Sequence, residues 1–137
     1  MNEGWLNDEY LIVFSEAESI SASSKYKLSQ YLSGYTLVGL RGGDDFIVIN
    51  PSGVMCSLPT VPLDPTMATP FSLPESLVLQ SDERFTGRIK WYLKPLILGG
   101  DPQDKSNLAW VSLDQHAELV VWWNDQYKTL KEQAAHA

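Results

Sequence analysis

The chain has 137 residues, of which 44% are hydrophobic and 11% aromatic, and it carries a formal net charge of −7 at pH 7. This composition indicates one folded domain and excludes a disordered chain. The negative charge argues against direct binding to nucleic acid, whose phosphates would repel it, and it favours a basic protein partner. Plain solubility explains the same acidity without any partner.

Cysteine content and the N-terminal sequence bear on the compartment. Cys56 is the only cysteine, so the chain forms no internal disulfide and nothing favours an oxidising environment. Residues 1–10 contain three acidic side chains and lack the basic stretch of a secretory signal. No apolar run reaches the roughly 20 residues that cross a bilayer. We therefore expect a cytoplasmic protein with no membrane contact.

The N-terminal part of the chain combines an apolar cluster with a helix-start signal. Residues 8–14 form either a strand or a buried helical turn, and their number does not decide between the two. Ser15, followed three residues later by Glu18, matches a capping box, so a short helix to about Ser24 is expected. A loop then leads to Gly34.

The next part has the pattern of an antiparallel meander. Segments 35–40, 46–50 and 54–58 are rich in β-branched, aromatic and other apolar residues. A Gly-Gly-Asp-Asp turn separates the first two segments, and Asn50-Pro51-Ser52-Gly53, which fits a type I turn, separates the last two.

The middle of the chain is expected to be a loop followed by a strand. Five prolines between residues 59 and 74 exclude a helix interior or a central strand, and apolar side chains among them anchor the loop to the surface. Residues 88–93 alternate apolar and polar side chains and predict a fourth strand, with residues 96–98 as a short extra one.

The C-terminal part predicts one long amphipathic helix. Residues 107–111 are an apolar lead-in, Ser112 is a good N-cap with Gln115 at the capping-box position, and the helix extends to Lys131 with a frayed tail at 132–137. The whole chain, residues 1–137, is thus expected to be a single α+β domain. It consists of a twisted, mostly antiparallel sheet flanked by helices.

The two faces of this helix differ sharply at 100° per residue. The expected core stripe consists of His116, Leu119, Val120, Trp123, Tyr127 and Leu130. The opposite side consists of Asp114, Glu118, Val121, Trp122 and Asp125. An exposed tryptophan ringed by carboxylates is typical of an interface anchor. The alternative is that a loop or an extra strand covers Trp122 and makes it a second layer of core.

Enzyme and metal motifs were tested against the sequence. His116-Ala117-Glu118 matches half of a zinc deaminase signature, but the required Pro-Cys-x-x-Cys does not follow. Cys56 lies in an apolar run with no basic neighbour to activate its thiol, so a Cys56–His116 nucleophile is not favoured. The Asp44-Asp45 pair supplies too few ligands for calcium. We expect no catalytic residue, no metal and no cofactor.

One basic cluster interrupts the acidic chain. It consists of Arg84, Arg88, Lys90 and Lys94. These residues could contact an acidic partner, pair with the acidic helix face of a second copy, or simply form a solvated sheet face.

Short motifs in the chain resemble the SUKH superfamily, which comprises bacterial immunity proteins and fungal regulators of cell-wall synthesis. The similarity begins with Glu16 or Glu18 before Ile20 and continues with Leu32-Ser33-Gly34-Tyr35 and the glycine-bearing turn that follows. It extends to the segment from Gly99-Gly100-Asp101-Pro102 to Trp122-Trp123-Asn124. The resemblance implies an α+β fold without cofactor that binds a secreted or contact-delivered toxin domain and blocks it.

The expected partner is therefore a cognate toxin domain, basic in charge, for example a nuclease. The residues expected to contact it are Asp114, Glu118, Trp122 and Asp125, with Asp44 and Asp45 as a second acidic edge. The alternative is a non-enzymatic adaptor or regulator with several weak partners. The sequence leaves monomer and dimer equally open.

Overall fold

The meander expected between residues 35 and 58 forms the centre of the main sheet in the computed structural model, which describes residues 2–95 and 98–135. Its strands are β3 (Thr36–Arg41), β4 (Asp45–Ile49) and β5 (Met55–Pro59), all antiparallel. The expected turn between the last two is present, because the Gly53 amide donates to the Asn50 carbonyl at 2.9 Å. This part of the prediction is confirmed.

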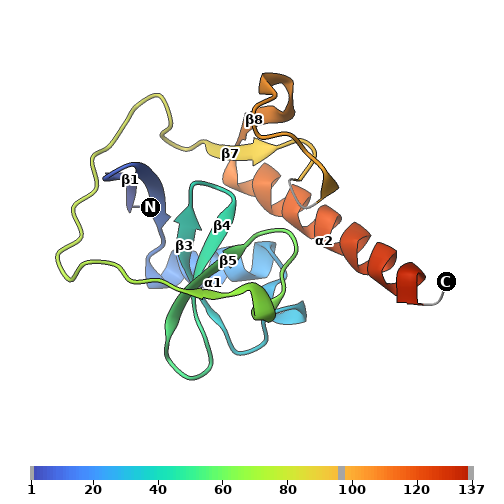
Figure 1. Cartoon of the computed structure of the whole chain (residues 1–137). Coiled ribbons are helices and arrows are strands. Elements are labelled where there is room, and N and C mark those ends of the chain that lie inside the picture. Colours follow the sequence, from blue (N-terminus) through green and yellow to red (C-terminus); the bar gives the residue numbers. More distant parts are fainter. Residues whose placement is uncertain (1, 96–97, 136–137) are drawn as a thin grey trace.

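Further strands extend the sheet on both sides. Residues 8–14 form a strand, β2 (Glu9–Val13), which pairs with β3 and with β1 (Asn2–Leu6), a strand that the sequence reading did not include. A short strand, β6 (Thr69–Pro70), pairs with β5. The sheet has six antiparallel strands in chain order, β1 to β6 (Figure 1).

The expected fourth strand is present and lies in a second, two-stranded sheet. It is β7 (Ile89–Tyr92), and it pairs with β8 (Leu108–Val111), which the sequence reading had only as a lead-in to the helix. The prediction of a strand at residues 88–93 is confirmed. The free edge of β5 is occupied by β6, so no edge of β5 is left for β7. The expected extra strand at 96–98 falls largely on residues 96–97, which lie outside the described part of the chain.

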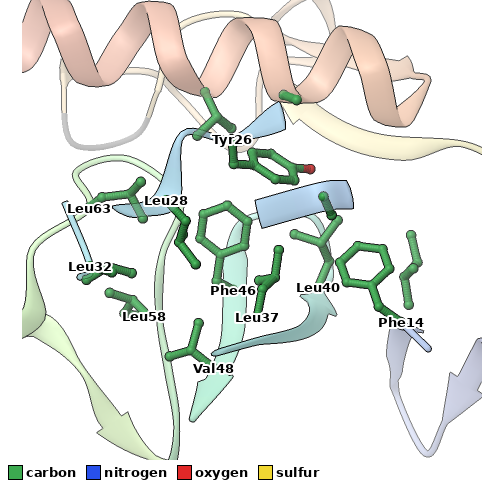
Figure 2. Packing of buried hydrophobic residues seen from close by; sticks show 14 of the residues in the cluster. Phe14, Tyr26, Leu28, Leu32, Leu37, Leu40, Phe46, Val48, Leu58 and Leu63 are labelled. Carbon is green, nitrogen blue, oxygen red and sulfur yellow. The ribbon is translucent and has the colours of Figure 1, made fainter. Parts of the chain in front are cut away.

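The first helix, α1 (Glu16–Lys25), begins as expected at a complete capping box between Ser15 and Glu18. It packs on β3, and its Ser19 hydroxyl donates to the Leu37 carbonyl. The next residue after the helix, Tyr26, is fully buried and meets Phe46 edge-to-face with ring centroids 4.8 Å apart. A short 3-10 helix, η1 (Leu28–Gln30), follows. Figure 2 shows Phe46, Leu37 and Val48 pointing from the sheet toward the layer that contains Tyr26.

Two further 3-10 helices lie in the loops of the described chain. They are η2 (Pro65–Met67) in the proline-rich segment and η4 (Lys105–Asn107) before β8. Each is capped by an aspartate whose carboxylate accepts a backbone N–H two residues later, Asp64 in the first case and Asp104 in the second. The carboxylates of these loops thus stabilise local turns, as expected for aspartate in such positions.

The long C-terminal helix, α2 (Leu113–Ala135), is capped by Ser112 and Gln115 as expected. It continues four residues beyond Lys131, where the sequence predicted its end. Glu132, Gln133, Ala134 and Ala135 are all favourable helix residues and no breaker precedes them. In Figure 1 the last turns of α2 extend past the sheet.

The buried face of α2 is rotated relative to the expected stripe. Its fully buried residues are His116, Ala117, Val120 and Asn124. Leu119, Trp123 and Tyr127 are only half-buried, and Leu130 is 52% exposed, so its assignment to the core was wrong. At 100° per residue the stripe turns by roughly 60° about the helix axis. Leu130 also lies in the part of the helix that outruns the sheet, where nothing covers it.

Candidate interaction surface

Trp122 lies on the outward side of α2. The indole is 53% exposed, which decides between the two readings left open by the sequence: Trp122 is not second-layer core. Its ring packs edge-to-face against Trp123, with ring centroids 4.8 Å apart and ring planes at 90°. This contact fixes the orientation of a large apolar side chain that remains in solvent, as an interface anchor requires.

Carboxylates line one side of Trp122, as the sequence predicted, and each is exposed. Asp114 forms a salt bridge with Lys25 of α1 at 2.7 Å. Asp125 accepts a hydrogen bond from the Tyr31 hydroxyl at 2.8 Å. Burial of the phenol and this carboxylate together raise the pKa of Tyr31 to about 12. Glu118, one turn before Trp122, makes no hydrogen bond or salt bridge with any described residue.

The other side of Trp122 is apolar. Leu119 and Trp123 lie there half-buried, and Leu130 follows about two turns later with 52% of its surface exposed. We refer to Asp114, Glu118, Leu119, Trp122, Trp123 and Asp125 together as the α2 outer face. It combines an apolar centre with an acidic margin, which is the usual arrangement of a protein-binding surface.

The structure does not bring Asp44 and Asp45 to the α2 outer face. Asp44 lies in the turn between β3 and β4, next to Gly43, whose carbonyl is 3.1 Å from His116 Nε2, and Asp45 is the first residue of β4. Because His116 is on the buried side of α2, the turn contacts the inner side of the helix and Trp122 points away from it. The six predicted contact residues therefore form two separate groups.

Asp44 and Asp45 are also less open than an acidic edge would be, because both are half-buried. Burial raises the pKa of Asp44 to about 6, although Lys90, 3.7 Å from the carboxylate, opposes this shift. Burial likewise raises the pKa of Asp45, with Arg41 opposing it. Both carboxylates are thus held where their charge is poorly solvated.

Two clefts meet at these aspartates. The first, of about 370 Å³, has aromatic walls and contains basic side chains, among them Arg41, Arg88 and Lys90. The second, of about 390 Å³, is mostly apolar. Both have the size of small-ligand or side-chain pockets. We refer to the second as the Asp44 cleft, and it is lined by Asp44, Asp45, Pro59, Thr60, Val61, Pro62, Met67, Trp91, Tyr92 and Pro95.

His116 serves the fold. It is fully buried, with the Tyr26 hydroxyl 2.6 Å from Nδ1. Because the Gly43 carbonyl can only accept, Nε2 carries the proton and Nδ1 accepts from Tyr26. Burial lowers the pKa of the ring to about 4. Glu118 lies on the opposite face of α2, so the His-x-Glu pair does not converge. Burial also raises the pKa of the Cys56 thiol, which is the reverse of nucleophile activation.

Asn124 is a buried polar residue that the sequence reading missed. Its side chain accepts from the Leu63 amide at 2.8 Å and donates to the carbonyls of Thr60 and Val120 at 2.8 and 2.9 Å. These bonds attach α2 to the proline-rich segment. Its position four residues after Val120, on the same helix face, was a usable signal.

The basic cluster of Arg84, Arg88, Lys90 and Lys94 does not form a single sheet face. Of its members only Lys90 lies in β7, where it pairs with Asp44. Arg84 lies outside the strand, bonds Asp82 at 2.8 Å and stacks over Phe85. The positive charges are thus partly neutralised within the chain.

Comparison with known proteins gives no match among family models, curated proteins or solved structures. Within residues 2–95 and 98–135, no helix has both the length and the apolar composition that crossing a membrane demands. In the same residues, no three histidine, cysteine or acidic side chains gather in a way that could hold a metal ion.

Proposed function

We propose that this protein is an immunity protein that binds a cognate toxin domain and blocks it, with the α2 outer face as its principal contact surface. The observation that carries the proposal is the half-exposed, oriented Trp122 beside three exposed carboxylates. The motifs shared with the SUKH superfamily support the same function. We also propose that the protein acts in the cytoplasm of the cell that it protects.

The exposed part of Trp122 is large enough to anchor a complex. A tryptophan offers about 250 Å² of surface, so burying the exposed 53% removes roughly 130 Å² from water. At about 25 cal/mol per Å² this contributes about 3 kcal/mol to binding. Leu119 and Trp123 extend the apolar contact around it.

The carboxylates supply direction and specificity. A net charge of −7 attracts a basic partner over a long range, and Glu118 and Asp125 place part of that charge next to the anchor. Rim charges of this kind chiefly raise the association rate and make it sensitive to salt. A nuclease toxin, with a surface suited to phosphates, has the complementary charge.

The test is a calorimetric titration against the C-terminal domain of the protein encoded immediately upstream, together with growth rescue on co-expression. We expect one-to-one nanomolar binding and rescue. The Trp122→Ala variant should bind about 100-fold more weakly while keeping its melting temperature, because the ring contributes little to the core.

The matched control is Leu130→Ala, which removes an equally exposed apolar side chain from the same helix, away from the acidic margin. It should leave affinity nearly unchanged. Absence of binding at micromolar concentrations would refute the immunity function and favour an adaptor. Equal losses for both variants would refute Trp122 as the anchor.

A further inference from the structure

The Asp44 cleft has walls suited to a long side chain with an apolar stem. Of the residues that line it, Pro59, Val61, Pro62, Met67 and Pro95 are apolar, and Trp91 and Tyr92 are aromatic. Met67 is 40% exposed at the cleft. A stem of three methylene groups would gain contact with these walls without placing a polar atom against them.

The carboxylates of Asp44 and Asp45 line this cleft and are incompletely paired with cations. Arg41 is held by Glu9, which accepts from Nε at 2.8 Å and from a second guanidinium nitrogen at 2.5 Å. Lys90 is the nearest cation to Asp44, and at 3.7 Å the pair is loose. Asp45 makes no salt bridge or side-chain hydrogen bond within the described chain.

An additional cation can reach the two aspartates through the Asp44 cleft. The first cleft already contains Arg88 and Lys90, whereas the lining of the Asp44 cleft includes no lysine, arginine or histidine among the described residues. The raised pKa of Asp44 reflects a carboxylate that is desolvated and incompletely paired. An incoming cation would lower that pKa and be bound by the same interaction.

Trp91 contributes a buried aromatic ring to the wall of this cleft. It lines the cleft, is only 4% exposed, and its indole N–H has no hydrogen-bond acceptor within the described residues. The nitrogen has no exposed surface, so a ligand in the cleft would meet the indole ring and not its N–H.

We infer that the Asp44 cleft binds an arginine side chain of the partner protein, with the guanidinium on Asp44 and Asp45 and the stem against Met67 and the prolines. Arginine suits the site better than lysine, because its planar fork bonds two neighbouring carboxylates and stacks on aromatic rings such as Tyr92. The identity of the partner rests on the proposed function. The binding of an arginine side chain does not.

The experiment uses Nα-acetyl-L-arginine methylamide as a probe on the full-length, nitrogen-15-labelled protein. We expect saturable NMR shifts of the Trp91 indole N–H and of the Asp44 and Asp45 amides, with a dissociation constant of about 1 mM. The citrulline analogue, which has the same shape without the charge, should cause none. An Asp44→Asn, Asp45→Asn double variant should bind the probe at least roughly tenfold more weakly.

A second variant guards against a loss of folding in the double mutant. Met67→Lys places an ammonium at the exposed wall of the cleft and should compete with the probe without changing a buried carboxylate. Trp122→Ala should bind the probe normally. Equal shifts with citrulline, or no saturable shift well above millimolar probe, would overturn the inference.

The titration also separates this inference from the proposed function. Probe binding together with loss of toxin affinity in Asp44→Asn would assign the arginine to the toxin. Unchanged toxin affinity in the Asp44→Asn variant would show that the arginine does not come from the toxin. Probe binding without any toxin binding would refute the immunity function and leave the arginine site in place.

Discussion

His116 should make the stability of the fold depend on pH between about 6.5 and 4. Burial lowers its pKa in the folded protein to about 4, from an ordinary value of 6.5. Between pH 6.5 and about 4, His116 is therefore protonated in the unfolded chain but not in the folded chain. The free energy of unfolding falls as the pH is lowered, until His116 is protonated in both states. The difference of about 2.5 pKa units corresponds to about 3 kcal/mol in total and to about 2 kcal/mol at pH 5.

The structural cause is specific. The folded ring accepts a proton on neither nitrogen without losing a bond, because Nδ1 already accepts from Tyr26 and Nε2 already donates to Gly43. Protonation of Nδ1 would place its N–H opposite the O–H of Tyr26, so two donors would face each other in a buried site. Both bonds connect α2 to the rest of the domain, so the effect should appear in global unfolding.

The assay is urea unfolding followed by tryptophan fluorescence at pH 7.5 and pH 5, on the wild type and on His116→Gln. The variant should be less stable at pH 7.5 but should lose about 2 kcal/mol less than the wild type on acidification. Asp44 acts in the opposite direction, because its raised pKa makes the folded state gain protons first, but it is present in both proteins and cancels. His136→Gln is the matched control. A pH dependence that is the same in His116→Gln and wild type would refute the reasoning.

The remaining predictions concern single side chains and are checked by chemical unfolding. Asn124→Ala removes three buried hydrogen bonds and should cost about 2–4 kcal/mol, whereas the exposed Gln126→Ala should cost almost nothing. Gly43→Ala should destabilise the fold more than Gly53→Ala. Both glycines have a positive φ, a conformation that costs alanine about 1–2 kcal/mol. Only at Gly43 would the added Cβ also lie 2.3 Å from a backbone oxygen of β7. Equal losses would contradict this. Asp44→Asn should raise stability at pH 7.5 by less than about 1 kcal/mol, a small gain because the carboxylate is 40% exposed, and the gain should shrink below about pH 6 and vanish near the ordinary aspartate pKa of 3.8.

Local interactions explain which elements were predictable from the sequence. The capping boxes at Ser15 and Ser112 and the turn after Asn50 each join residues no more than four apart, so their sequence signals are complete in themselves. The same holds for the β-branched and other apolar residues concentrated in β3, β4 and β5. The helical period placed Trp122 outside the predicted core stripe, but only its exposed fraction in the structure excluded a loop or strand covering it.

Residues far apart in the chain decided the rest. Whether β7 joined the meander depended on β6 occupying the edge of β5, and residues 2–6 became a strand by pairing with β2. The exact rotation of α2 was set by Asn124 bonding Leu63, 61 residues away, and by His116 bonding Gly43, 73 residues away. The helical period can suggest that Asn124 and His116 are buried, but it does not identify their distant partners.

The environment of Asp44 shows the same division at the level of charge. The sequence alone shows that two aspartates, Asp44 and Asp45, follow the two glycines of a predicted turn. Only the tertiary structure placed them between two clefts, half-buried, with Lys90 as a loose partner. Desolvation depends on what packs around a group in space, so the sequence determined the charge of this protein, and the fold decided where that charge remains unsatisfied.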